Sequence, residues 1–169
     1  MIKKVHHIAY RCRDSEETRR FYEDFLGLPL VASMLLRKTK TGQSVDALHT
    51  FYALEDDSCL AFFEVPELAF EFKQQNDFDL HLALEVDQHA LHLMHTAGSA
   101  AGIETRGVID HGMIHSVYFR DPNGYVIELS AKSDGYHEAI TNASKDARTI
   151  LDSWQSAQKA SIQGTSPGS

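Results

Sequence analysis

The sequence predicts an α+β fold made of two copies of one module, each a strand, a helix and three further strands. The same order of elements occurs twice along the chain. The first strand of each half carries similar residues, His7-Ile8-Ala9 and His81-Leu82-Ala83. The last strand of each half places a Glu in an apolar run, Phe62-Phe63-Glu64-Val65 and Val126-Ile127-Glu128-Leu129. Internal repetition of this kind predicts the fold more strongly than the propensity of any single segment does.

The first half begins with an alternating segment rich in strand formers over residues 2–12, which predicts a strand. Asp14 can cap the helix that follows, and Glu17, three residues later, gives a capping-box pattern. Gly27 is placed to end this helix, whose apolar stripe consists of Phe21, Tyr22, Phe25 and Leu26. Strands are then expected near 30–36, 47–54 and 58–65, followed by a polar linker near 66–78.

The second half repeats this order with a strand over about 79–86 and a helix over about 88–97. Its remaining strands are expected near 103–109, 113–120 and 124–131. We therefore predict one domain over residues 1–131, with modules at about 1–66 and 79–131.

Residues 132–169 form a separate C-terminal extension. An amphipathic helix is predicted over 137–160, with apolar residues at helical spacing: Ile140, Ala143, Ala147, Ile150, Leu151 and Trp154. We expect this stripe to pack on its own sheet or on a second subunit, with a mobile lid as the alternative. The tail over 163–169 is expected to be disordered.

The bulk composition limits the possible partners. The 169 residues carry a net charge of −8, whereas nucleic acids and anionic membrane surfaces demand a basic face. Two cysteines are too few for a disulfide framework, so a cytoplasmic protein is expected. No signal peptide is visible, and no run approaches the roughly 18 apolar residues of a membrane span. A small molecule is the expected partner.

Four side chains in the repeated positions are candidate metal ligands. Strand side chains alternate between faces, so His7 and His81 each share a face with a small alanine two residues later, which leaves room for an ion. Glu64 and Glu128 lie in apolar strands, where a carboxylate is costly to bury unless it is paired or bound to metal. Imidazole and carboxylate together suit a divalent transition metal.

These residues resemble the vicinal oxygen chelate superfamily, which includes glyoxalase I, extradiol dioxygenases, methylmalonyl-CoA epimerase and fosfomycin-resistance proteins. The resemblance covers about residues 1–131 and lies in four stretches: His7-Ile8-Ala9, the helix from Thr18 to Leu28, His81 to Asp87, and Tyr118 to Leu129. It implies two βαβββ modules in an incomplete eight-stranded barrel around one divalent metal. The family's ligand positions fall on His7, His81 and Glu128, with Glu64 at the fourth position used by glyoxalases.

Within that superfamily, the stretch from Ile109 to Glu128 resembles the signature of extradiol dioxygenases. Carried over, His111 is the acid/base and Tyr118 the phenol that orients the substrate. The resemblance therefore implies a dioxygenase acting on a catechol-like molecule, with Fe(II) favoured and Ni, Co, Zn or Mn as alternatives. Two histidines and one carboxylate on one face of Fe(II) leave positions open for the substrate and O₂.

Two other functions stay open at this point. In a lyase or isomerase of the glyoxalase or epimerase type, the metal polarises vicinal oxygens and Glu64 or Glu128 removes a proton alpha to a carbonyl. In a drug-sequestering protein, the same fold binds a small molecule without turnover. Modules of this kind often pair across subunits, so a homodimer is one alternative for the oligomeric state, which the sequence leaves open.

Overall fold

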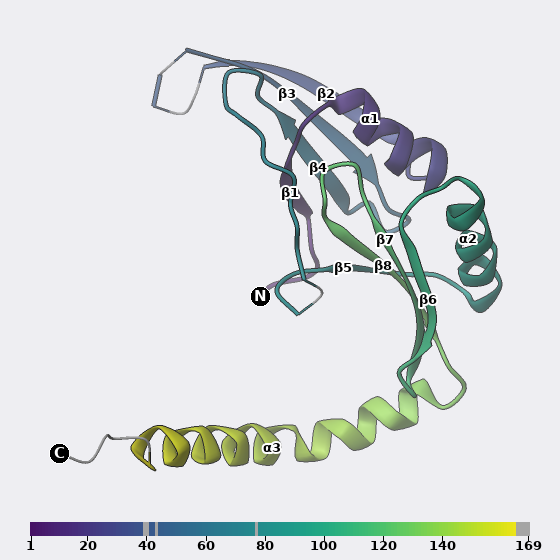
Figure 1. Cartoon of the computed structure of the whole chain (residues 1–169), viewed down its shortest axis with the longest axis vertical. Helices are drawn as coiled ribbons and strands as arrows, with labels where there is room; N and C mark the ends of the chain where they lie inside the picture. The colour runs from purple at the N-terminus through teal and green to yellow at the C-terminus, as the bar shows by residue number, and fades with distance from the viewer. Residues whose placement is uncertain (39–40, 43, 77, 165–169) are drawn as a thin grey trace.

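The protein consists of two open four-stranded sheets with the helices α1 and α2 on one side and a third helix, α3, that extends away from them (Figure 1). The computed structural model describes residues 1–38, 41–42, 44–76 and 78–164, and side chains as far as Lys159. The first module comprises β1 (His7–Cys12), α1 (Ser15–Arg19), η1 (Arg20–Phe25), β2 (Leu30–Lys38), β3 (Ser44–Ala53) and β4 (Cys59–Glu64). The second comprises β5 (Leu82–Glu85), α2 (Gln88–Ala100), β6 (Thr105–Asp110), β7 (Ile114–Arg120) and β8 (Val126–Lys132).

Both sheets have the same topology. The strand orders are β1-β4-β3-β2 and β5-β8-β7-β6, with the first pair of each order parallel and the others antiparallel. The prediction of two βαβββ modules is thus confirmed, and the sheets remain open rather than closing into one barrel. The C-terminal helix is also confirmed, as α3 (Tyr136–Gly164).

The main helices begin as their sequences indicate. The Asp14 carboxylate accepts a hydrogen bond of 2.8 Å from the backbone N–H of Glu17, and Asp87 accepts one of 2.7 Å from Ala90. Each bond satisfies a donor that an α-helix leaves unpaired in its first turn. The Glu17 carboxylate pairs with Arg13 rather than folding back on the cap. The helix started by Asp14 continues from α1 into a π-helical turn, η1, before Gly27 reverses the chain at a φ of +78°.

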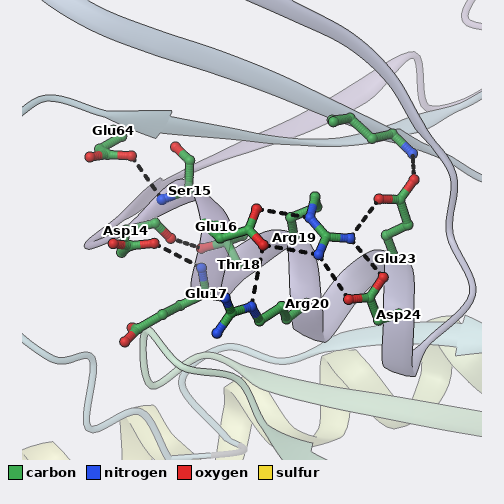
Figure 2. A network of polar contacts seen from close by, with 11 residues as sticks. Asp14, Ser15, Glu16, Glu17, Thr18, Arg19, Arg20, Glu23, Asp24 and Glu64 are labelled. Atoms are coloured by element: carbon green, nitrogen blue, oxygen red, sulfur yellow. Dashed lines mark hydrogen bonds and ion pairs between the residues drawn. The ribbon is translucent and has the colours of Figure 1, made fainter.

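The outer face of this helix carries a network of charged side chains (Figure 2). Arg19 binds three carboxylates, Glu16 at 2.9 Å, Glu23 at 2.9 Å and Asp24 at 2.6 Å. Glu23 also accepts a 3.0 Å hydrogen bond from the backbone of Leu30, which ties the helix to the start of β2. Because the Glu16 and Asp24 carboxylates are largely exposed, we assign the network a modest share of the stability.

The core joins the two modules through one face of each sheet. Leu60 and Phe62 on β4 are buried together with Ile127 and Leu129 on β8. Aromatic side chains cross the junction, with ring centroids 5.3 Å apart for Phe25 and Phe119 and 4.8 Å apart for Tyr10 and Tyr125. The opposite face of each sheet is therefore turned away from the core.

The turn between β7 and β8 connects the two modules through buried hydrogen bonds. Asp121 is buried and accepts a 3.0 Å hydrogen bond from the hydroxyl of Tyr22, 99 residues earlier in the chain. Asn123 accepts a 2.8 Å bond from the backbone of Arg13 and donates one of 3.2 Å to the Thr18 hydroxyl. Burial raises the pKa of Asp121, although its hydrogen bonds oppose that shift.

The helix α3 leaves the body at the end of β8 and extends away from both sheets (Figure 1). Every described side chain from 141 to 159 is exposed, so this stripe does not pack on its own sheet. In the part of the chain that the structure covers, no helix has the length and apolar character needed to span a membrane. The predicted disordered tail overlaps α3 at its first residues and otherwise lies outside the described part.

Candidate metal centre

The outward face of the second sheet gathers polar side chains in one row. Glu128 on β8 is paired with Ala83 on β5 and with Tyr118 on β7, and Tyr118 is paired with Arg106 on β6. Because paired residues share a face, these side chains lie beside one another. The small Ala83 leaves space next to the carboxylate.

Glu128 is a buried carboxylate with its two oxygens in different surroundings. Its Oε1 accepts hydrogen bonds from the hydroxyls of Ser116 at 2.5 Å and Ser130 at 2.8 Å. Its Oε2 lies 3.0 Å from Nε2 of His81, which precedes β5. The residue is 3% exposed, so these partners offset the cost of burying its carboxylate. One oxygen is thus held in place while the other faces an imidazole.

Tyr118 lies next to Glu128 and contacts two further polar side chains. Its hydroxyl is 3.1 Å from Nε2 of His111, and the guanidinium carbon of Arg106 lies 4.7 Å from the centroid of its ring. Burial, and then the negative charge of Glu128, raise the pKa of Tyr118. The phenol therefore stays protonated at neutral pH and is able to donate a hydrogen bond.

His7 lies on the outward face of the first sheet, among mainly apolar side chains. The equivalent row there runs from Ala9 through Ala61 to Phe51, and the His7 and Phe51 rings are 5.9 Å apart. Beside this row, His49 stacks on Phe63 with ring centroids 3.6 Å apart, and its Nδ1 is 2.9 Å from the carbonyl oxygen of Phe62. This face offers the exposed imidazole of His7 next to an aromatic wall that includes the buried ring of His49.

Glu64 does not lie on the same face as His7. It is paired with Cys12 on β1, so it shares the helix-covered face of the sheet with the core. Its carboxylate accepts a 2.8 Å hydrogen bond from the backbone N–H of Ser15, at the start of α1 (Figure 2). A carboxylate at this end of a helix pairs with a free donor and with the positive end of the dipole. The position in the first sheet equivalent to Glu128 is Ala61.

Three neighbours of Glu128 and Tyr118 were not identified from the sequence. Ser116 and Ser130 each stand two residues from a predicted site residue on the same strand, Tyr118 and Glu128 respectively. Strand alternation was therefore a usable signal for both serines. Arg106 reaches the site by pairing of β6 with β7, and the sequence carries no local signal for that register.

The donor set of the outward faces fits a divalent transition metal. His81 and Glu128 supply an imidazole nitrogen and a carboxylate oxygen at contact distance, and His7 supplies a second imidazole on the other sheet. Among the residues that the structure describes, no three His, Cys, Asp or Glu side chains of one chain gather closely enough to hold an ion. His81 and Glu128 are thus in contact with each other, whereas His7 lies apart from them.

The comparisons with known proteins agree with this architecture. The family model described as Glyoxalase/Bleomycin resistance protein/Dioxygenase superfamily matches residues 4–129. A glyoxalase/dioxygenase from Nostoc punctiforme is 26% identical, with a TM-score of 0.60, covering 78% of this chain and 92% of its own. The comparison with curated protein sequences gave no match.

Fosfomycin resistance proteins have the same fold. FosX from Listeria monocytogenes, in a complex with Mn(II) and sulfate, is 18% identical at a TM-score of 0.60, covering 81% of this chain and 98% of its own. FosX from Mesorhizobium loti is 19% identical at a TM-score of 0.59, with coverages of 82% and 99%. In each pair, the part of this chain without a counterpart is about the size of the C-terminal extension.

Proposed function

The chain belongs to the Glyoxalase/Bleomycin resistance protein/Dioxygenase superfamily, and from this premise we propose that it is an extradiol-type dioxygenase acting on a catechol-like small molecule. The observation that carries the proposal is the hydrogen-bonded pair of His111 and Tyr118 beside the Glu128 carboxylate. A phenol and an imidazole at this place can orient a diol and exchange its proton.

We propose His7, His81 and Glu128 as the ligands of one divalent metal, with Fe(II) favoured over Ni, Co, Zn or Mn. A bound Fe(II) with three protein ligands supplies open positions for both substrate oxygens and for O₂. Glu64 is left out of this set, because its carboxylate already caps α1 on the opposite face of the sheet. A three-ligand set is what an extradiol site needs.

We further propose that the complete site forms between two copies of the chain. The two modules of one chain pack through the faces opposite His7 and Glu128, so the two outward faces each need a partner surface. A homodimer that places the first sheet of one copy over the second sheet of the other brings an imidazole to the His81–Glu128 pair. The same contact closes the site from water on both sides.

The protein side chains then have separate tasks. The Tyr118 hydroxyl donates a hydrogen bond to an oxygen of the substrate, because its raised pKa keeps it protonated. His111, 3.1 Å from that hydroxyl, accepts the proton released by the substrate and returns it later in the reaction. Phe51, Phe63 and the ring of His49, which stacks on Phe63, provide an aromatic wall against which a substrate ring can pack.

The test combines metal content with oxygen consumption. The protein is purified without oxygen, its metal is quantified, and O₂ uptake is followed while a panel of catechols is added. We expect one iron per assembled site and one O₂ consumed per catechol cleaved. His111→Ala should abolish most turnover while retaining the metal. His115→Ala is the matched control, because His115 lies on the other face of β7 against Gln88.

Two results would overturn the proposal. Turnover of an alpha-oxo compound or a thioester without O₂ would assign the site to the lyases and isomerases. Binding of a small molecule that survives His81→Ala, with no turnover of any compound, would assign it to the sequestering proteins.

A further inference from the structure

The helix α3 is an addition to the superfamily domain, and its apolar side chains lie uncovered. The family match ends at residue 129, whereas α3 has 29 residues beginning at Tyr136. Ile150 is 65% exposed and Trp154 62% exposed, and Ile140 and Leu151 are exposed as well. A series of large apolar side chains along one helix marks a contact surface rather than scattered surface hydrophobics.

From Tyr136 to Ala157, apolar residues fill every a and d position of a heptad repeat, and Leu151 flanks them at an e position. With Ile140 at position a, the a and d positions are Tyr136, Ile140, Ala143, Ala147, Ile150, Trp154 and Ala157. Five of the six described charged residues fall on the outer positions b, c and f: Glu138, Lys145, Arg148, Asp152 and Lys159. Asp146 is the sixth and lies at a flanking g position. An apolar seam with charges on the far side is the pattern of a helix that pairs with another helix.

The polar residues of α3 indicate that this helix needs a partner helix for its stability. Serine, threonine and asparagine, which have modest helix propensity, recur along it, for example at Thr141, Asn142 and Thr149. Isolated helices are marginal in water even with better sequences, and most helices gain their stability from packing of an apolar face. In α3 that packing is missing within the chain, because its described side chains from 141 to 159 are all exposed.

We propose that α3 pairs with the α3 of a second copy of this chain, as an antiparallel two-helix coiled coil. In an antiparallel pair, a positions face d positions of the partner helix. One register places Ile140 opposite the partner's Ala157, Ala147 opposite the partner's Ile150, and Trp154 opposite the partner's Ala143. Each large side chain then meets a small one, which is the arrangement that fills a core without voids.

The parallel arrangement fits less well. Parallel helices put identical residues opposite each other, so Trp154 meets Trp154 while Ala143 and Ala147 meet alanines and leave gaps. The antiparallel pair also sets the two bodies at opposite ends, since α3 leads away from its own sheets (Figure 1).

The chain's own apolar groove is a poorer partner for the seam. This groove is lined by Leu26, Leu28 and Leu54 and is rimmed by the acidic residues Glu55 and Asp56. The cations of α3, such as Lys145 and Arg148, lie on the face away from the seam and do not reach this rim. Self-pairing instead leaves all of those charges in water.

The test uses Trp154 as a reporter, because it is the one tryptophan of the sequence. Trp154 emission and molar mass by sedimentation are measured over a range of protein concentrations. We expect blue-shifted emission that moves to longer wavelength on dilution, in step with a halving of the mass. Ile150→Glu should produce the same shift at high concentration, whereas Thr149→Glu, on the outer face, should not. If the outward sheet faces also pair, Ile150→Glu lowers a tetramer to a dimer.

The orientation is tested with single cysteines in a Cys59→Ser background. Ala147→Cys near the centre should form a disulfide between chains, whereas Ala143→Cys should not. Efficient crosslinking through Ala143→Cys would overturn the antiparallel arrangement. Emission typical of solvated tryptophan at every concentration, or buried tryptophan that is independent of concentration and of Ile150→Glu, would overturn the pairing itself. Metal content and the far-UV spectrum of each variant confirm that the body remains folded.

Discussion

The two sheets share one topology but carry different side chains in equivalent rows. In the second sheet the row reads Ala83, Glu128, Tyr118, and in the first it reads Ala9, Ala61, Phe51. His81 lies two residues before Ala83 in the second sheet, and His7 lies two residues before Ala9 in the first. The two sheets thus share one backbone framework, but the second sheet carries a carboxylate and a phenol where the first carries an alanine and an aromatic ring. Equivalent position in a repeat does not imply equivalent chemistry, and each difference can be tested.

Removing the Glu128 carboxylate should have the largest effect, because it makes the second row resemble the first. We expect Glu128→Ala to lower metal affinity by more than about 100-fold, beyond the usual loss for a residue that only supports a ligand. Metal titration measures this. Glu85→Ala, on the same sheet face but exposed, is the control and should bind metal normally. Equal metal binding by Glu128→Ala and the control would contradict the assigned ligand set.

Tyr118→Phe tests the residue beside Glu128 in the same row. Phe51 occupies the equivalent position in the first sheet. We expect kcat to fall about 100-fold through loss of the hydroxyl, with metal affinity unchanged. Steady-state O₂ uptake and metal titration separate the two quantities. The reciprocal change, Phe51→Tyr, should leave kcat within a few-fold. A parallel loss of metal from Tyr118→Phe would mean that the phenol supports the ligands rather than the substrate.

The turns between the last two strands also differ between halves. Asp121 is buried and joins the modules, whereas Asp56 in the corresponding turn of the first half is exposed and bonds locally to Ser58. We expect Asp121→Ala to lower the free energy of unfolding by about 2–3 kcal/mol through its lost partners. Asp56→Ala should lower the free energy of unfolding much less than Asp121→Ala does, because Asp56 is exposed. Urea unfolding measures both.

The stability that the Asp121 carboxyl contributes should depend on pH. Burial raises the folded pKa of Asp121 above the ordinary carboxyl value of about 3.9. Its contribution is therefore complete below that unfolded pKa and is lost as the pH rises through the folded pKa. The stability advantage of wild type over Asp121→Asn should shrink as the pH rises from about 4 toward neutrality. An advantage that grew over this range would contradict the direction of the shift.

A smaller effect is expected from the two serines on Glu128, which have no counterpart in the first sheet. Ser116→Ala and Ser130→Ala each leave Oε1 with one donor instead of two. We expect a loss of about 10-fold in metal affinity for each variant. Ser133→Ala, whose hydroxyl bonds to the carbonyl of Gly112, is the control. Unchanged affinity in the double serine variant would show that the carboxylate holds its orientation without them.

Glu64 should give the smallest effect. Loss of its hydrogen bond to Ser15 in Glu64→Ala should cost about 1 kcal/mol of stability and leave metal affinity unchanged. Thermal unfolding and metal titration together distinguish a cap from a ligand. Loss of metal at unchanged stability would return Glu64 to the ligand set.

The sequence predicted the elements well because their signals are local. Asp14 marks a helix start, Gly27 marks a helix end, and the strands follow from short apolar runs. The face of Glu64 could not be obtained in this way. Its apolar surroundings resemble those of Glu128, but the pairing of β1 with β4 decides which face a residue occupies. A one-residue change of register reverses that face, and loops of unequal length hide the register from a sequence comparison.

The turn at Asp121 and Asn123 has a consequence for how the molecule unfolds. Its hydrogen bonds reach Tyr22, Thr18 and the backbone of Arg13, while the backbone of Lys73 in the connecting segment bonds to Asn123 at 2.8 Å. Neither half therefore keeps its buried polar groups satisfied when it separates from the other. Although the two modules share one topology, the pair should melt as one cooperative unit, with amide exchange in both sheets governed by a single global opening.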